Sequence, residues 1–286
     1  SENPNGIFVD ATFGGGGHSR EILSRLGPKG KLIAFDRDSD AIANAPDDKR
    51  LILIHNNFRF IQNFVHTLGY LGKVDGILAD LGVSSHQFDT GERGFSFRFD
   101  APLDMTMNQL AKISAADVVN TYSQEDLTRI FKTYGEVEKP WKAAELICSA
   151  REKGAINTTG DLSKAVEKLY NKFTEHKFLA KLYQALRIEV NKEMRSLEDF
   201  LQGTIASLKP QGRLSVITYH SLEDRMVKNF IKTGNVEGET QKDFFGKNLS
   251  PFEAINKKPI LPPDDEIASN TRSRSAKLRI AELKED

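Results

Sequence analysis

The sequence predicts an α/β protein with a doubly wound sheet and an inserted all-helical domain. Three observations support this prediction. Short apolar runs that end in polar residues alternate with helical patterns in the first third of the chain, as expected of parallel strands buried on both faces. Long helical patterns replace the strands in the middle of the chain. Strand and helix patterns then alternate again toward the C-terminus.

The apolar runs and the segments between them give an expected order of elements. A long helix from Leu182 to Ala206 leads through a Pro-Gly turn into a buried strand, and Thr233 to Asp265 is expected to be a long loop. In the middle of the chain, Ser123 stands where a helix N-cap is expected. The expected strands are 7–10, 32–36, 51–55, 74–81, 213–219 and 276–283.

We therefore predict two domains. Residues 1–110 and 184–286 are expected to form the sheet domain, which is discontinuous in sequence. Residues 111–183 are expected to form the helical insertion. Between residues 112 and 187 there are 13 basic and 10 acidic side chains, a mild local surplus of positive charge.

Composition excludes several classes of protein. The 286 residues are 39% hydrophobic and 28% charged, which fits a soluble globular protein with a real core. There is no apolar run of membrane-spanning length and no signal-peptide pattern, so no membrane association is expected. The single cysteine, Cys148, excludes a disulfide framework and a cysteine-based zinc site. We predict a cytoplasmic protein without a metal site.

Overall charge does not indicate a nucleic-acid-binding protein, because 40 basic residues balance 40 acidic ones. Any such site must be a local patch. One candidate is the run from Arg272 to Arg279, with four cations in eight residues. A solvated edge strand with outward-facing charges is an equally good interpretation of this run.

Four consecutive glycines, Gly14–Gly17, follow a strand-like run that ends in Asp10 and precede a helical pattern. Glycines let the backbone turn sharply and a ligand approach closely, and the helix N-terminus behind them offers unpaired N–H groups. A second strand-like run ends in Asp36, 19 residues after Gly17. An acid at about this distance binds ribose hydroxyls in α/β nucleotide folds.

The glycine spacing narrows the choice of cofactor. The dinucleotide fingerprint would need a third glycine where this chain has Ser19 or Arg20, and no Lys-Ser or Lys-Thr pair follows for a triphosphate loop. What remains is a nucleoside-type cofactor without a pyrophosphate, for which S-adenosylmethionine is the obvious candidate. A glycine turn in an ordinary α/β protein is the alternative for the loop taken alone.

Further motifs lie after the fourth and fifth strands. Asp80 to Gln87 follows the fourth strand, where α/β folds place ligands. Arg93 to Phe97 comes next, and Tyr219 to Arg225 follows the fifth strand. Taken one at a time, these are modest signals, because a strand-end Asp often caps a helix.

As a set, the motifs resemble the family of S-adenosylmethionine-dependent methyltransferases that modify N4 of a cytidine in small-subunit ribosomal RNA, the bacterial MraW or RsmH family. The resemblance runs from Gly6 to about Glu282. The matching segments are Asp10 to Ser19, Phe35 to Asp38, Asp80 to Ser85, Arg93 to Phe97, Gln184 to Asn191, His220 to Arg225 and Arg274 to Arg279.

The resemblance implies a Rossmann-like class I methyltransferase sheet and a set of cofactor contacts. Phe58 would lie on the adenine side, although it could be a core residue, and His18 could simply stand at the helix start. The implied cofactor-binding residues are Gly16, Gly17, His18, Asp36, Phe58, Asp80 and Gln87.

The chain also departs from the family pattern. His86 stands where many members have proline, and Thr106 stands where arginine is common, which weakens any RNA-contact role there. The family usually has a His-x-Pro-Val-Leu segment before the glycine strand, and the sequence starts too late to contain it.

The N4 amine of cytosine is a poor nucleophile because its lone pair is delocalised into the ring, so methyl transfer to it requires catalysis. A group that accepts a hydrogen bond from N4 would stabilise the developing ammonium form. We expect Asp80, or backbone carbonyls beside it, to do this, and His220 is the other candidate. A structural cap on the following helix is the alternative role of His220.

The extruded base is expected to stack on Phe95 or Phe97. Arg274 and Lys277 are the candidate RNA contacts of the basic run, and the helical insertion is expected to dock the RNA. The implied partner is the small ribosomal subunit with its 16S ribosomal RNA, and assembly as a homodimer is left open.

Two rival functions are retained. One is an amino-methyltransferase that acts on another nucleic acid or on protein. The Asp/Asn-Pro-Pro-Tyr loop of many amino-methyltransferases is missing after Asp80, which argues against DNA. The other is a non-catalytic docking protein with a cofactor fold, and the intact acids Asp10, Asp36 and Asp80 argue against it.

Overall fold

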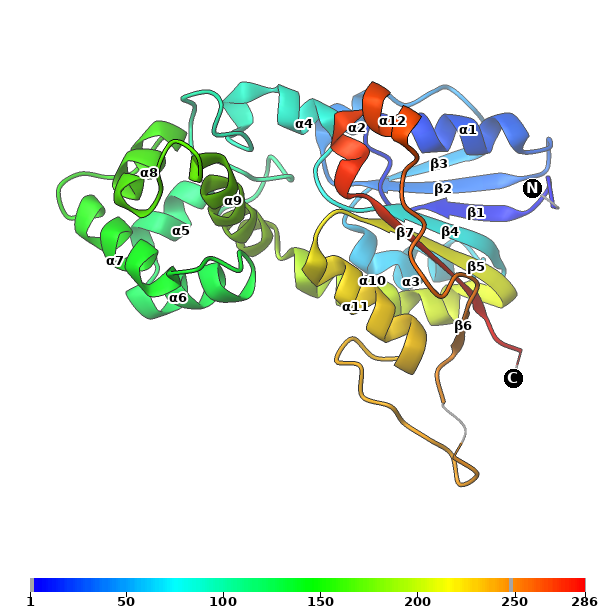
Figure 1. Ribbon diagram of the computed structural model, residues 1–286. Helices are drawn as coiled ribbons and strands as arrows, with labels where there is room; N and C mark the ends of the chain where they lie inside the picture. Colours follow the sequence, from blue (N-terminus) through cyan, green and yellow to red (C-terminus); the bar gives the residue numbers. More distant parts are fainter. Residues whose placement is uncertain (1–2, 247–248, 286) are drawn as a thin grey trace. The chain divides into compact units, whose positions relative to one another are not determined.

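The computed structural model describes residues 3–246 and 249–285 of the chain, which form two compact units (Figure 1). The sheet unit consists of Ser1–Gly82 and Met194–Asp286, and the helical unit of Val83–Glu193. The helical unit is therefore larger than the predicted insertion, 111–183. The prediction followed the start of the helical patterns, but the preceding loop already packs into the helical core through Leu103 and Met105.

The sheet unit contains seven strands in the order β3-β2-β1-β4-β5-β7-β6. β1 to β5 are parallel, whereas β7 runs antiparallel to β5 and β6 antiparallel to β7. This arrangement confirms the predicted doubly wound α/β class. The strands are β1 (Ile7–Asp10), β2 (Lys31–Asp36), β3 (Leu51–His55), β4 (Val74–Asp80), β5 (Leu208–Thr218), β6 (Phe252–Ala254) and β7 (Lys277–Leu283).

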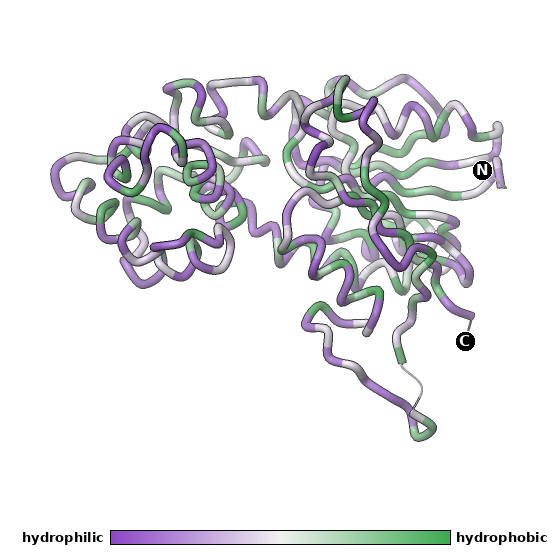
Figure 2. Tube along the Cα trace, in the orientation of Figure 1, coloured by the Kyte–Doolittle hydropathy of each residue, from purple (hydrophilic) through white to green (hydrophobic). Residues whose placement is uncertain are grey.

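Helices cover both faces of this sheet. On one face, Leu23 and Leu26 at the end of the first helix pack against Leu32 of β2. On the other face, the larger core includes Ile61 and Phe200. Apolar residues concentrate along the strands, as Figure 2 shows. The helices of this unit are α1 (Gly17–Arg25), α2 (Ser39–Ala43), α3 (Ile61–Thr67), α10 (Glu193–Ser207), α11 (Ser221–Thr233) and α12 (Asp264–Ser269).

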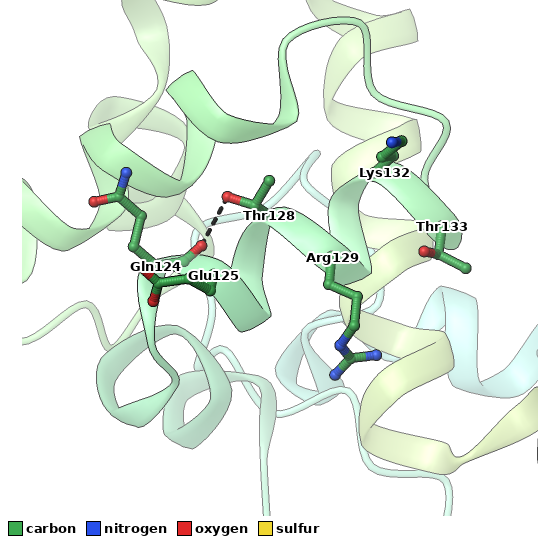
Figure 3. A pocket seen from close by; sticks show the side chains of 6 residues that line it. All are labelled: Gln124, Glu125, Thr128, Arg129, Lys132 and Thr133. Atoms are coloured by element: carbon green, nitrogen blue, oxygen red, sulfur yellow. Dashed lines mark hydrogen bonds between the residues drawn. The ribbon is translucent and has the colours of Figure 1, made fainter.

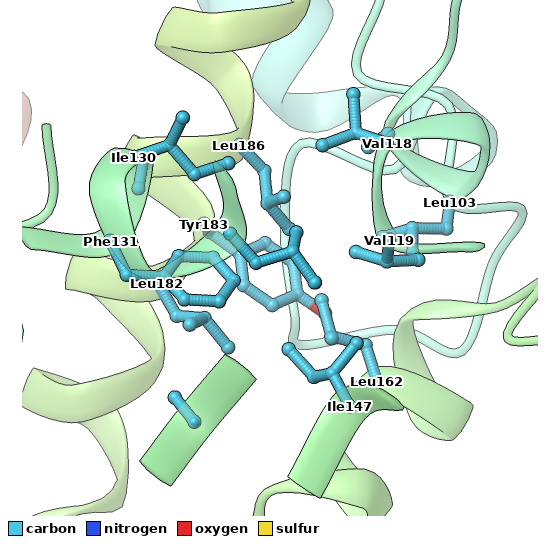
Figure 4. Close-up of a cluster of buried hydrophobic side chains, with 14 of the residues drawn as sticks. Leu103, Val118, Val119, Ile130, Phe131, Ile147, Leu162, Leu182, Tyr183 and Leu186 are labelled. Carbon is cyan, nitrogen blue, oxygen red and sulfur yellow. The ribbon is translucent and has the colours of Figure 1, made fainter. Parts of the chain in front are cut away.

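The helical unit has a separate hydrophobic core (Figure 4). Phe131, Leu162 and Leu186 are completely buried within it. Ser123 accepts a hydrogen bond from the backbone N–H of Asp126, which confirms the predicted N-cap. The helices are α4 (Ser85–Asp89), α5 (Ala115–Thr121), α6 (Gln124–Thr133), α7 (Pro140–Arg151), α8 (Thr159–Ala165) and α9 (Glu175–Asn191).

The single helix predicted from Leu182 to Ala206 is wrong. The chain breaks at Lys192, which is left-handed (φ 50°) and separates α9 from α10. Asn191 fixes the end of α9, because its side chain donates to the Met105 carbonyl (2.7 Å) and accepts from the Met107 N–H (2.8 Å). The break therefore depends on contacts with residues far away in the sequence. No glycine or proline stands at this position to indicate it.

Two other expected elements differ in detail. The predicted Pro-Gly turn before the fifth strand is part of β5, where Gln211 is left-handed (φ 64°) and the register against β4 shifts between Val74 and Gly76. The predicted loop from Thr233 to Asp265 starts at the last residue of α11, and its described residues, 233–246 and 249–265, contain only β6 and the start of α12 as further helices or strands.

A buried ion pair ties β7 to α11. Nε of Arg279 lies 2.7 Å from Oδ1 of Asp224, and Nη2 lies 3.2 Å from Oδ2. Burial disfavours ionised Asp224, but the bonds from Arg279 and the nearby Lys277 outweigh it and lower the pKa of this carboxyl. Arg279 is thus a structural residue, and the predicted basic patch loses one of its four cations.

Replacing Arg279 by alanine should lower the free energy of unfolding by about 1.5–3 kcal/mol, because it removes two charge-assisted hydrogen bonds to the largely buried Asp224 carboxylate and leaves only Lys277 beside it. Urea unfolding of both proteins measures this difference. Arg274→Ala, at an exposed position in the same run, is the matched control and should change stability by less than about 0.5 kcal/mol. Equal stability of the two variants would contradict the structural role of Arg279.

Candidate functional site

Three acidic residues end three parallel strands of the sheet unit. Asp10 ends β1, Asp36 ends β2 and Asp80 ends β4. β1 pairs in parallel with both β2 and β4, so all three strand ends lie at one edge of the sheet. In open α/β sheets this edge, at the point where the strand order reverses, is where ligands bind.

Asp10 is completely buried and fixes the start of α1. One carboxylate oxygen accepts a hydrogen bond from the Ser19 hydroxyl (2.7 Å) and the other accepts from the Thr12 N–H (3.1 Å). Burial raises the pKa of Asp10, and these hydrogen bonds oppose the rise. Asp10 therefore has a structural role: it joins the end of β1 to the start of α1.

The four glycines have two different roles. Gly14 (φ 52°) and Gly16 (φ 75°) are left-handed, a conformation that favours glycine. A Cβ at Gly16 would also lie 2.9 Å from the Phe13 ring. Gly15 and Gly17 have no such constraint, and a Cβ at either would meet nothing within 4 Å. These two glycines leave open space beside the N-terminus of α1, which a ligand can fill.

Asp36 connects the end of β2 to the glycine loop. Its carboxylate accepts hydrogen bonds from the Gly14 N–H (2.7 Å) and the Asp38 N–H (2.8 Å). Burial raises the pKa of this carboxyl, and the backbone donors oppose the rise. A carboxylate has about four acceptor sites, so Asp36 can also accept from the hydroxyls of a ribose.

Asp80 is held from three sides. The Tyr219 hydroxyl donates to Oδ1 (2.8 Å), Nε2 of His18 lies 3.4 Å from Oδ2, and the Asp80 N–H donates to the Thr12 hydroxyl (2.7 Å). The hydrogen bond with Asp80 raises the pKa of His18, although burial acts against it. Burial and the nearby Asp80 carboxylate raise the pKa of Tyr219.

Tyr219 was not among the predicted site residues. It follows β5 directly, and β5 pairs with β4 so that Ile217 lies opposite Asp80. This pairing joins residues 139 positions apart, which is why the motif pattern alone did not identify the contact. The only sequence signal was the position of Tyr219 at a strand end.

His220 caps α11. Its Nδ1 accepts a hydrogen bond from the Glu223 N–H (3.4 Å), and its side chain is largely buried. Nε2 lies 3.1 Å from Oε1 of Glu223 but is not aligned for a hydrogen bond with it. The structure thus has the capping role that the sequence left open, and the proton-accepting role of His220 stays a prediction.

Phe58 follows β3 as the first residue of a short 3₁₀ helix, Phe58–Phe60. Its ring is half-buried and contacts the Phe200 ring edge-on, with 5.2 Å between centroids. It therefore packs against the core while keeping part of its surface exposed.

Three predicted site residues lie in the helical unit. Gln87 is buried, and its side-chain oxygen accepts from the Ser84 N–H (3.1 Å) at the start of α4. Phe95 is only 7% exposed and belongs to the core of the helical unit, so its ring faces no open surface, and its predicted stacking on a base stays a prediction. Phe97 is half-buried and contacts the rings of Tyr183 and His176 edge-on, with centroids 5.3 and 5.1 Å apart.

The two predicted RNA contacts of the basic run differ in environment. Arg274 is exposed, in a 3₁₀ segment that covers Thr271–Ser275. Lys277 is half-buried, with its Nζ 3.5 Å from Oδ2 of Asp224. Only Arg274 projects freely toward solvent.

A surface hollow of about 510 Å³ lies on α6 (Figure 3). All of its lining residues come from this one helix, and the Thr128 hydroxyl donates a hydrogen bond to the Gln124 carbonyl (2.7 Å). None of the predicted site residues lines it, so we assign it no site. The lining residues are Gln124, Glu125, Thr128, Arg129, Lys132 and Thr133.

Membrane insertion through a helix is not indicated. Across residues 3–246 and 249–285, every helix is too short or too polar to cross a bilayer.

Replacing Asp80 by asparagine should lower the pKa of His18, because the largest raising interaction is lost and burial is then opposed only by the charges of Asp10 and Glu266. NMR titration of the imidazole measures this, with the resonance assigned through its absence in His18→Gln. Tyr219→Phe is the control, since it keeps the Asp80 carboxylate and should keep the pKa of His18 raised. An unchanged His18 titration in Asp80→Asn would mean that the pair does not exist in solution.

Comparison with known proteins places the chain in a family. The model of the MraW methylase family matches residues 1–284. A protein of Bacteroides fragilis named "Ribosomal RNA small subunit methyltransferase H" is 57% identical over 282 residues, which cover 99% of this chain and 92% of that protein. A protein of the same name from Parabacteroides distasonis is 56% identical over 279 residues, covering 98% and 92%.

Solved structures resemble the chain more distantly. A putative rRNA-methylase from Clostridium thermocellum is 15% identical with a TM-score of 0.42, and covers 98% of this chain and 90% of that one. A putative S-adenosylmethionine-dependent methyltransferase from Listeria monocytogenes is 9% identical with a TM-score of 0.40, and covers 98% and 92%. The fold assignment rests on the strand order, and the family assignment on the sequence matches: this chain belongs to the MraW methylase family.

Proposed function

We propose that this protein transfers a methyl group from S-adenosylmethionine to N4 of a cytidine in the 16S ribosomal RNA of the small subunit. The observation that carries the proposal is the open glycine loop, which lies at the same sheet edge as Asp36 and Asp80. Relatives that share more than half of the sequence are named ribosomal RNA small subunit methyltransferase H. A cytoplasmic location follows from this substrate, and a homodimer remains a prediction.

The residues at this edge fit S-adenosylmethionine. The open side of Gly15 and Gly17 allows close approach to the helix N-terminus, and Asp36 has acceptor capacity left for ribose hydroxyls. Phe58 offers a partly exposed ring for the adenine. When bound, the cofactor supplies a methyl group already activated by its sulfonium, so the protein mainly has to align and desolvate the acceptor.

We assign to Asp80 the role of accepting a hydrogen bond from N4, the nitrogen that receives the methyl group. As N4 attacks, positive charge develops on it, and a carboxylate that accepts a hydrogen bond from N4 stabilises that charge. Tyr219 and His18 hold Asp80 in one orientation beforehand, so little reorganisation is needed during the reaction. Phe97 is our candidate for stacking on the target base, and Arg274 and Lys277 for contacts with the RNA backbone.

A methyltransferase that acts on another nucleic acid or on protein is the competing function. Incubation with labelled cofactor and small subunits that lack the modification, followed by mapping of the label, separates the two. Label on one cytidine of the 16S ribosomal RNA, with strong inhibition by salt, is the expected result. Label on another base, or on ribosomal protein, would overturn the proposal. Free RNA and free protein serve as controls.

Gly17→Ala should fold normally, because the new Cβ meets no atom and alanine favours the helix. It should weaken binding of S-adenosylmethionine at least about fivefold, because the methyl group occupies space that the ligand needs. Calorimetric titration measures the affinity, and a thermal melt checks the fold. Gly154→Ala, at a glycine with equally open surroundings in the helical unit, is the control. Unchanged affinity in Gly17→Ala would place the cofactor elsewhere.

Tyr219→Phe should lower kcat about tenfold or more, since it removes a hydrogen bond to a charged group, and leave the affinity for S-adenosylmethionine unchanged. Steady-state kinetics on small subunits provide the comparison. Tyr70→Phe, at a half-buried tyrosine of the sheet unit with no assigned role, is a matched conservative control. A rise in KM with kcat intact would assign Tyr219 to substrate binding rather than to orienting Asp80.

A further inference from the structure

The helical unit exposes an aromatic side chain at the start of α9. Phe173 is 95% exposed, although its backbone and that of its neighbours form hydrogen bonds. Oδ1 of Asn171 accepts from the backbone N–H groups of Phe173 (3.0 Å) and Thr174 (3.1 Å). The Asn171 carbonyl also accepts from the Glu175 N–H (2.8 Å). These hydrogen bonds fix the backbone of the turn and do not involve the phenyl ring, which stays exposed to solvent.

Positive charge surrounds this side chain in the sequence. Between residues 164 and 181 there are five lysines and two glutamates. Lys181 donates to the Glu136 carbonyl (2.8 Å) and is partly used within the fold. Lys172 and Lys177 are exposed, and neither forms an ion pair with an acidic side chain in the described part of the chain.

These groups lie in the turn before α9 and in its first helical turn. The bonds from Glu175 to Asn171 and from Phe178 to Thr174 are of the α type, so the turn continues directly into the helix. Phe173 and Lys177 are four positions apart across this junction, which is about one helical turn. His176 lies between them and touches the Phe97 ring. The surface formed by Lys172, Phe173, His176 and Lys177 thus adjoins the side chain that we assign to the target base.

We infer that this surface binds an unpaired segment of the substrate RNA, with a base stacked on Phe173 and phosphates bound by Lys172 and Lys177. An exposed aromatic ring among cations is what single-stranded nucleic acid requires, since bases stack on the ring and phosphates need positive charge. The inference rests on the proposed function and adds to it where, and in which form, the RNA is held.

A second exposed aromatic residue of the helical unit provides the contrast. Trp141 is 56% exposed, but its neighbour Lys142 is paired with Glu145 at 2.9 Å. The cation nearest to the Trp141 ring, Lys142 at 5.6 Å from the ring centroid, is therefore already paired, unlike Lys172 and Lys177. Trp141→Ala is therefore a matched control for the loss of an exposed ring.

The test measures binding of a short labelled single-stranded RNA to the full-length protein by fluorescence anisotropy at several salt concentrations. Phe173→Ala should weaken binding at least about fivefold. Lys172→Gln with Lys177→Gln should reduce the slope of log affinity against log salt by about 1.4, from about 0.7 per lost phosphate contact. Trp141→Ala should bind like the wild type, and thermal melting should be unchanged in all variants because the side chains are exposed.

Wild-type affinity in Phe173→Ala would overturn the inference, as would an equal loss of affinity for the same RNA in duplex form. Normal RNA binding by the variants combined with weaker binding to small subunits would also overturn it, in favour of a ribosomal protein partner. Failure of the proposed function looks different, because the wild type would then not methylate small subunits at all.

Discussion

The parallel pairing of β1 with β2 on one side and β4 on the other is the constraint on which the site depends. It brings Asp10, Asp36 and Asp80 to one sheet edge, although they are far apart in sequence. Without in-register pairing, the glycine loop would have no acid to anchor Gly14 and no neighbouring strand end to face. The helices and the sheet edge beyond β5 serve to keep this arrangement fixed.

The three acidic residues have different roles because they are buried to different degrees. Asp10 is fully buried, and its carboxylate oxygens accept hydrogen bonds from Ser19 and Thr12, so it stabilises the fold. Asp36 and Asp80 keep part of their surface and part of their acceptor capacity. Burial decides which carboxylates are available to a ligand, and similar positions at strand ends therefore have different functions.

Much of this could be predicted from the sequence, because strands buried on both faces end in polar residues that mark the sheet edge. The positions of most strands, the glycine loop, Asp36 and Asp80 followed from such local patterns, whereas the order of the strands in the sheet did not. The contact of Tyr219 with Asp80 and the break at Lys192 depend on pairings between distant residues, which no local pattern encodes. The burial of Phe95 was missed for a related reason: two phenylalanines two positions apart, Phe95 and Phe97, look alike until the core that covers one of them is known.

The antiparallel strand β7 has a consequence for how the protein is made. β7 covers the edge of β5 and supplies Arg279 to Asp224 of α11, the helix that directly follows Tyr219 and His220. Because β7 is synthesised after every other part of the site, a nascent or prematurely ended chain lacks this support. Such a chain also leaves the β5 edge open to pairing with other strands. The support that β7 gives to α11 and to the β5 edge is therefore complete only once the whole chain has been made.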